Sequence, residues 1–206
     1  MRDAGWKLGA LALAAGTLCC AGREPMRGQE QAGLDRKLAT YAWIEEGDLA
    51  SVIVGTRAAR YRDGANYVPI EIAIANRGLR VLELTRESFT LIDEQGNRYP
   101  CASPSELMSG YEFLDLDRDQ LAELRSITLN RFATFHQQAS KFSPTRDVRD
   151  DRLNVVRDRV ALPKFAYIID YIYFPKPPTG IKGHRFELFV ESAQLPSPLF
   201  VKFRVE

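Results

Sequence analysis

The sequence has few of the residues that metal centres and disulfide frameworks require. Its 206 residues include three cysteines and two histidines, and neither His136 nor His184 has a cysteine or histidine at ligand spacing. Structural zinc sites and disulfide scaffolds need such residues in closely spaced groups. We therefore expect no metal and no cofactor, and a fold that is stabilised by its apolar core.

A strong excess of one charge is also lacking. Twenty-eight basic and 27 acidic residues give a formal net charge of +1, and the basic residues are scattered along the chain. Domains that bind nucleic acid usually gather Lys and Arg into a patch or stripe, so we expect no nucleic-acid partner. Hydrophobic residues make up 45% of the chain and charged residues 27%. This ordinary globular composition excludes global disorder.

Motifs typical of catalytic sites are absent, because the sequence contains no GxSxG, P-loop or dinucleotide fingerprint. Cys101 is the remaining candidate nucleophile, with one of the two histidines as its base. A cysteine that follows a strand also fits inert packing in the core. We therefore expect that the protein is not an enzyme.

The spacing of three aspartates matches the start of a calcium-binding loop. Asp115, Asp117 and Asp119 have the opening spacing of an EF-hand loop, but Gln120 replaces the glycine at the turn. Ser126 stands where the loop needs a glutamate that binds calcium through both oxygens. Acidic residues at a helix N-terminus explain the run better.

The N-terminus has the pattern of a secretory leader. Two basic residues precede an apolar run, Leu8–Leu18, which is too short to span a bilayer alone. The run ends at Cys19 and Cys20, and this segment resembles a bacterial lipoprotein leader. The resemblance implies lipidation of Cys20, with Cys19 as the alternative. Cleavage after Ala21, which would release a secreted soluble protein, and an uncleaved anchor also fit the pattern.

The segment Ala166–Phe174, AYIIDYIYF, is apolar on both faces if it forms a strand. Successive side chains of a strand point to opposite faces. Tyr167, Ile169, Tyr171 and Tyr173 would share one face, and Ile168, Asp170, Ile172 and Phe174 the other. We therefore expect a strand that is covered on both sides.

Alternating apolar residues predict about eight strands joined by short turns, a pattern typical of an antiparallel sandwich. Besides the segment above, the expected strands lie at 49–58, 67–75, 81–84, 89–92, 98–99, near Leu153, at 185–191 and at 199–205. We assign residues 1–20 to the leader, 21–47 to a tether or arm and 48–206 to the sandwich, with an insertion at 103–150.

The insertion changes to a helical period. Between residues 120 and 142 the apolar positions recur at threes and fours. Asp117 is a plausible N-cap and Pro144 a stop, so we expect one amphipathic helix over about 117–142. Its apolar stripe is expected to cover the outer face of the strand at 167–174.

The segment YVPIEIAIANRGLRVLELTRESFTLIDEQGNRYP carries a family resemblance. An alternating strand ends at Asn76, a glycine turn follows, and Ser88-Phe89-Thr90-Leu91 leads into a hairpin from Asp93 to Tyr99. The segment resembles the immunoglobulin-like sandwich of uncharacterised bacterial surface and periplasmic lipoproteins. The resemblance implies an immunoglobulin-like fold and an extracytoplasmic location, without an activity.

Two segments are candidate binding sites. An aromatic sugar or peptide groove is one possibility, although aromatic residues of a strand more often lie in the core; its members would be Tyr167, Tyr171, Tyr173 and Phe174. The proline-rich loop after the strand is stiff and therefore pre-organised for a partner. There the expected interaction surface consists of Lys176, Pro177, Pro178, His184 and Arg185.

These patterns predict a lipoprotein of the bacterial cell envelope that is anchored through an N-terminal lipid, on the periplasmic or outer-membrane face. We expect it to act as a binding or structural module, with an envelope protein or a glycan as its partner. One alternative is an envelope hydrolase that uses Cys101 or an acidic pair. Another is a periplasmic assembly or chaperone factor that offers an edge strand to its client.

Overall fold

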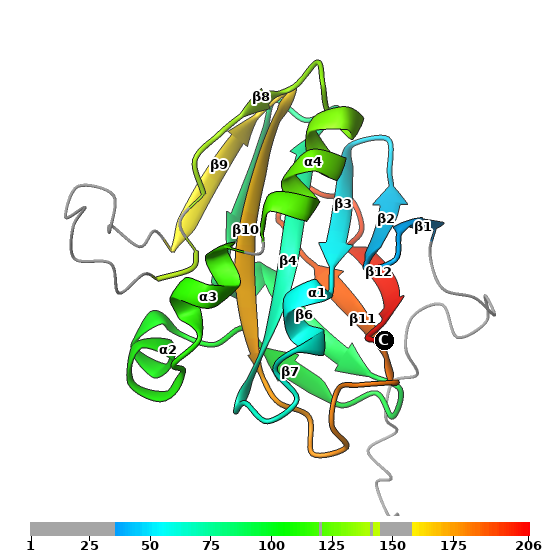
Figure 1. Cartoon of the computed structure of the whole chain (residues 1–206). Coiled ribbons are helices and arrows are strands. Elements are labelled where there is room, and N and C mark those ends of the chain that lie inside the picture. The colour runs from blue at the N-terminus through cyan, green and yellow to red at the C-terminus, as the bar shows by residue number, and fades with distance from the viewer. Residues whose placement is uncertain (1–35, 120, 141, 145–157) are drawn as a thin grey trace, which may run out of the picture.

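The computed structural model describes residues 36–119, 121–140, 142–144 and 158–206 (Figure 1). The expected leader, with Cys19 and Cys20, lies outside these residues. So do the first part of the expected tether and the expected strand near Leu153.

The described residues form three β-sheets. Their strands are β1 (Arg36–Ala39), β2 (Ala42–Glu46), β3 (Ala50–Gly55), β4 (Tyr67–Asn76), β5 (Val81–Thr85), β6 (Phe89–Asp93), β7 (Arg98–Pro100), β8 (His136–Gln137), β9 (Arg159–Pro163), β10 (Ala166–Pro175), β11 (Arg185–Val190) and β12 (Leu199–Arg204). One sheet has the order β1-β2-β3-β4-β10-β8, another has the order β12-β11-β6-β7, and the third pairs β5 with β9. The described pairings are antiparallel except that of β8 with β10.

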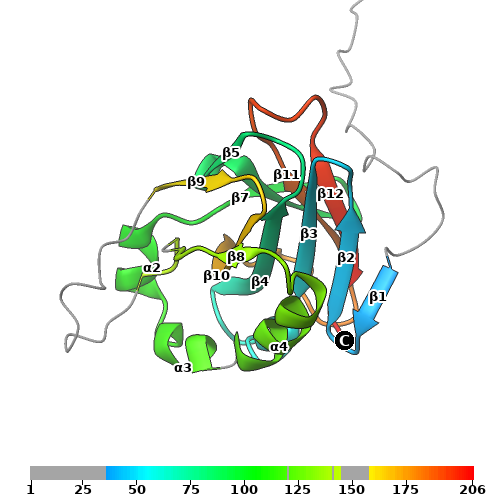
Figure 2. The same ribbon diagram turned by 90° about the horizontal axis from the view of Figure 1, so that it is seen from above.

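The two larger sheets face each other and form the main core between them (Figures 1 and 2). Trp43 and Ile70 of the six-stranded sheet share this core with Leu91 and Phe203 of the four-stranded sheet. The Trp43 and Phe203 rings lie 6.2 Å apart between their centroids. Leu82 of β5 extends the same core toward the small sheet. The expected mainly β, antiparallel sandwich with a helical insertion is therefore confirmed.

Helices cover the outer face of the six-stranded sheet. They are α1 (Arg57–Arg60), α2 (Pro104–Gly110), α3 (Leu114–Asp119) and α4 (Leu121–Arg131). Leu124 of α4 belongs to an apolar cluster with Tyr167 and Ile169 of β10. Tyr171 and Tyr173 belong to another cluster, to which α2 and α3 contribute. One face of β10 is thus covered by two groups of helices, which we call the helical lids: α4 covers Tyr167 and Ile169, and α2 with α3 covers Tyr171 and Tyr173.

Strand β10 is covered on both sides, as expected. Every residue from Ala166 to Phe174 is buried, and Ile168 and Ile172 belong to the main core. The possibility of an open aromatic groove on this strand is wrong, because the helices and the second sheet enclose its rings. The rings in question belong to Tyr167, Tyr171, Tyr173 and Phe174, and none is more than 2% exposed.

Asp170 is the one charged residue of β10, and it holds the end of the insertion. The Ser140 hydroxyl and the Phe142 backbone N–H each donate to its Oδ2 at 2.7 Å. Burial raises the pKa of Asp170 above its ordinary value, and these donors oppose the rise. The carboxyl therefore fixes Ser140 and Phe142 beside β10. This contact helps to place the Phe142 ring in the main core.

The expected single helix over 117–142 is wrong in its bounds. The insertion forms α3 and α4, and α4 ends at Arg131. The following chain instead pairs with β10: His136 N–H donates to the Phe165 carbonyl and Gln138 N–H to the Tyr167 carbonyl, both at 2.8 Å. A strand edge offers unpaired backbone groups, and this pairing satisfies them. Asp117 does not cap the helix, because it is buried within α3.

The expected boundary at residue 48 also needs correction. Residues 36–46, assigned to a tether or arm, form β1 and β2 of the six-stranded sheet. The reason is burial: Trp43 faces the main core and Ile44 lies in the cluster beneath α4. The described part of the sheet therefore begins at Arg36.

Gly55, at the end of β3, leaves room for the buried side chain of Glu71. A Cβ at Gly55 would lie 2.6 Å from Glu71 Oε2 and 2.9 Å from its Cβ. We expect Gly55→Ala to lower the free energy of unfolding by about 1–3 kcal/mol, the usual cost of overpacking. Urea titration measures the loss. The matched control is Gly64→Ala, where a Cβ meets no atom within 4 Å. Equal stability of the two variants would contradict the prediction.

Candidate functional site

A buried ion pair joins the turn after α1 to the helical insertion. Arg62 Nη2 lies 2.7 Å from Asp117 Oδ1, and the two side chains are 8% and 0% exposed. The Tyr111 hydroxyl donates to Asp117 Oδ2 at 2.5 Å. Burial raises the pKa of Asp117, while Tyr111 and Arg62 oppose that rise. The pair fixes residues 61–66 against α3.

Aromatic rings surround this ion pair. The Arg62 guanidinium lies 4.5 Å from the centroid of the Phe113 ring, within the range of a cation–π contact. The Tyr111 ring lies edge-on to Phe113 at 5.7 Å and to Tyr173 at 5.2 Å. Burial raises the pKa of Tyr111 well above its ordinary value, so its hydroxyl stays protonated and remains a donor. The rings and the ion pair form one packed cluster, which we call the floor because a cleft lies above it.

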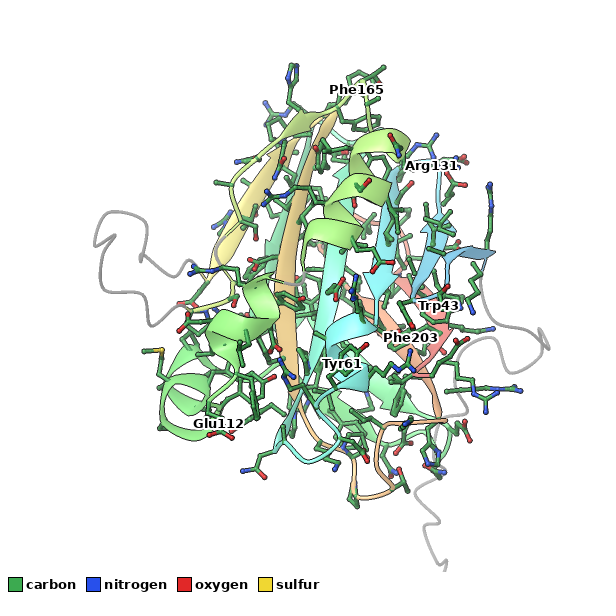
Figure 3. All side chains as sticks on the ribbon, viewed as in Figure 1. Trp43, Tyr61, Glu112, Arg131, Phe165 and Phe203 are labelled. Atoms are coloured by element: carbon green, nitrogen blue, oxygen red, sulfur yellow. The ribbon has the colours of Figure 1, made fainter. Side chains whose placement is uncertain are left out.

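Above this floor lies a cleft of about 580 Å³, which we call the Tyr61–Phe113 cleft. Its volume falls in the range of about 300–1,000 Å³ that is typical of small-molecule sites. The side chains that line it include Tyr61, Arg62, Asn66, Ser109, Glu112 and Phe113. They come from the turn before β4, from the last turn of α2 and from the connection between α2 and α3. Tyr61 and Glu112 both lie in the lower half of Figure 3.

The α2 side of the cleft has a well-defined local structure. Ser103 caps α2, and its side chain exchanges hydrogen bonds with Glu106 in a capping box. Pro104 occupies the first turn, where a missing N–H costs nothing. The pattern Ser103-Pro104-Ser105-Glu106 is typical of a helix start, so this signal could have located α2 from the sequence. No comparable pattern in the sequence marks Tyr61 or Phe113 as members of a site.

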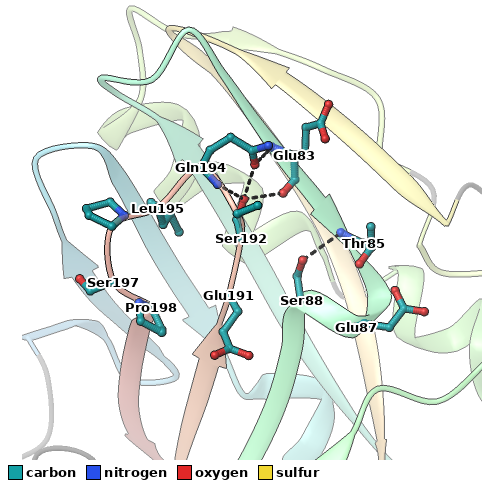
Figure 4. A pocket seen from close by; sticks show the side chains of 12 residues that line it. Glu83, Thr85, Glu87, Ser88, Glu191, Ser192, Gln194, Leu195, Ser197 and Pro198 are labelled. Atoms are coloured by element: carbon teal, nitrogen blue, oxygen red, sulfur yellow. Dashed lines mark hydrogen bonds between the residues drawn. The ribbon is translucent and has the colours of Figure 1, made fainter.

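A second cleft, of about 490 Å³, lies beside β5 and the loop before β12 (Figure 4). Its polar groups mainly satisfy each other: the Ser192 hydroxyl donates to the Glu83 carbonyl at 2.8 Å, and the Gln194 side-chain oxygen accepts from the Glu83 N–H at 3.2 Å. The Glu83 carboxylate pairs with Arg159. These contacts fasten the loop to β5, so this cleft is less suited to a ligand than the Tyr61–Phe113 cleft.

The expected interaction surface on the proline-rich loop is split by the fold. Lys176 is half-buried, and its Nζ donates to the Asp63 carbonyl. Its backbone N–H donates to the Asn66 carbonyl at 2.9 Å, so Lys176 braces the turn that borders the cleft. Pro177 is buried, whereas Pro178 is exposed.

Of the other two residues of that surface, His184 lies just before β11 and Arg185 is its first residue. His184 is half-buried and Arg185 is exposed. The Arg185 backbone N–H donates to Glu94 Oε1 at 2.7 Å, which ties it to the β6–β7 hairpin. The structure therefore places Lys176 against the turn that borders the Tyr61–Phe113 cleft, while Arg185 contacts a different loop.

The surroundings of Cys101 do not activate its thiol. Cys101 is half-buried, and its Sγ lies 3.7 Å from the Ala102 carbonyl. Burial raises the pKa of Cys101, which favours the thiol over the nucleophilic thiolate. This is the opposite of the lowered pKa that cysteine nucleophiles usually have.

The aspartate run does not form a calcium loop, because it lies in α3. Asp117 is occupied by Arg62 and Tyr111, and Asp115 lies 3.9 Å from Arg118. Among the described residues, no group of three or more His, Cys, Asp or Glu side chains is placed to hold a metal ion. Nor does any helix in the described part of the chain have the length and apolarity needed to cross a bilayer.

Comparisons with known proteins give one distant likeness. No protein-family model matches the sequence, and no curated protein matches it. Among solved structures, the chain is similar to ycdA, a candidate lipoprotein from Bacillus subtilis, with a TM-score of 0.39 and 12% sequence identity. The match covers 78% of this chain and 38% of the ycdA chain. Because this similarity is so low, the function has to be inferred from the chemistry of the site.

Proposed function

We propose that the protein is a lipid-anchored binding module of the bacterial cell envelope, and that the Tyr61–Phe113 cleft is its ligand site. The observation that carries the anchor is the leader pattern, an apolar run, Leu8–Leu18, which ends at Cys19 and Cys20. In this proposal Cys20 carries the lipid and the rest of the chain faces the extracytoplasmic space.

The arrangement of the fold supports a binding role at a membrane. Strand β1, the first described element, lies on the opposite side of the molecule from α2 and α3 (Figures 1 and 2). A chain held through its N-terminus would therefore leave the cleft open to the surroundings. The cleft is also built from groups that are held in place before any ligand arrives, which lowers the entropic cost of binding.

Metabolic labelling with radioactive palmitate tests the anchor. In a bacterial host, we expect the full-length chain to incorporate the label and Cys20→Ala to lose it, since the thiol is the acceptor of the lipid. Cys19→Ala is the matched control and keeps the label. A wild-type chain without label, or a Cys20→Ala chain that keeps it, would overturn lipidation of Cys20.

A further inference from the structure

We propose that the Tyr61–Phe113 cleft binds a neutral or N-acetylated oligosaccharide. The inference rests on the proposed function only for the source of the sugar, the cell envelope. Its physical basis is the combination of exposed aromatic surface, short polar side chains and nearly balanced charge in one cleft.

The aromatic surface comes from Tyr61 and Phe113. Tyr61 is 59% exposed, although a ring of this size usually buries most of its surface. The Arg60 guanidinium lies 5.8 Å from the centroid of the Tyr61 ring and helps to fix its orientation. A pyranose ring presents C–H groups on its flat faces, and these pack favourably against the electron-rich face of an aromatic ring.

The polar side chains of the cleft suit hydroxyl groups. Asn66 and Glu112 are exposed at its rim, and together they offer both donors and acceptors. The Ser109 hydroxyl donates to the Ser105 carbonyl at 2.9 Å, so its proton is engaged and its oxygen keeps lone pairs that can accept a hydrogen bond. A sugar hydroxyl both donates and accepts, and it can pair with each of these groups.

The charge of the cleft disfavours anionic ligands. Arg62 is the cation among its lining residues, and Asp117 already balances it. Glu112 adds a negative charge at the rim. Phosphate, sulfate and nucleic acid need cations that are free to pair, so a neutral ligand fits better.

Glycan-array binding followed by calorimetric titration tests the inference. The purified full-length chain is applied to glucans, N-acetylglucosamine oligomers and phosphorylated oligosaccharides. We expect binding to a neutral or N-acetylated member, and a loss of affinity of about tenfold or more in Tyr61→Ala, because the stacking surface is removed.

A second variant fills the cleft without disturbing the fold. Gly64 lines the cleft, and a Cβ there meets no atom within 4 Å, so we expect Gly64→Leu to fold normally and to lose binding. The matched control is Phe165→Ala, which removes another exposed ring, 49% exposed, at the upper end of Figure 3. This control should bind like the wild type.

Several outcomes would overturn the inference. These are an array without a binder, binding to phosphorylated members alone, or equal affinities of wild type, Tyr61→Ala and Gly64→Leu. The test is separate from the anchor, because palmitate labelling depends on Cys20 and sugar binding does not. Failure of one experiment therefore leaves the other interpretable.

Discussion

Asp117→Ala is expected to lower the free energy of unfolding by about 3–5 kcal/mol, the usual cost of removing one partner of a buried ion pair. The Arg62 guanidinium would keep its charge in an interior position that is 8% exposed, without the carboxylate 2.7 Å away. The Tyr111 hydroxyl would also lose its acceptor. Urea unfolding followed by circular dichroism measures the change.

Two variants test whether the loss of stability comes from the unpaired buried charge of Arg62 or from the removal of a carboxylate alone. Asp115→Ala removes an exposed aspartate of the same helix, and we expect a change within about 0.5 kcal/mol. The double variant Arg62→Met with Asp117→Leu removes both charges and should recover much of the stability, because apolar pairs often replace buried ion pairs without loss. A loss below about 1 kcal/mol in Asp117→Ala would contradict a buried, charged pair.

Glu71→Gln is expected to raise the stability at neutral and higher pH and to flatten its dependence on pH. Burial raises the pKa of Glu71 from 4.5 to about 7, although the Ala58 N–H and the Tyr171 hydroxyl both donate to its Oε1 at 3.2 Å. The folded protein therefore keeps a proton on Glu71 in a range of pH where the unfolded chain has lost it.

The sign of the effect follows from this difference in bound protons. As the pH rises from about 4.5 to about 7, the unfolded chain releases the proton first, so the wild-type protein loses stability. At about 1.4 kcal/mol for each unit of pKa, the loss reaches about 3 kcal/mol above pH 7. Glutamine keeps an acceptor for both donors and carries no charge to desolvate. It avoids this loss.

Unfolding free energies of the two proteins between pH 4 and pH 8 provide the measurement. The difference between Glu71→Gln and the wild type should grow with pH and level off above about pH 7. Asp170 is also buried with a raised pKa, and it contributes the same pH dependence to both proteins. Parallel pH profiles for the two would show that Glu71 ionises as readily in the folded state as in the unfolded chain.

The sequence predicts β10 well because its evidence is local. Alternation over Ala166–Phe174 shows two apolar faces, and a strand with two apolar faces has to lie between layers. The end of α4 at Arg131 could not be predicted in the same way. It depends on the edge of β10, which is distant in the chain and draws residues 136–138 into pairing.

The candidate site could not be predicted from the sequence, for a related reason. Tyr61 and Phe113 lie on separate loops, and the contact that brings these loops together is the ion pair between Arg62 and Asp117. In the sequence, Asp117 stands in a run of alternating aspartates, which reads as a helix start or a partial calcium loop. An ion pair between residues so far apart leaves no periodic pattern, so only the tertiary structure reveals it.

The enclosure of β10 has a consequence for the protein once it unfolds. A stretch of this kind, rich in Tyr and Ile with high β-propensity, is typical of segments that aggregate when they are exposed. Asp170 is its single charge and thus its only internal gatekeeper. Heating should therefore end in irreversible precipitation, and the rate at which the helical lids open would set the lifetime of the native protein.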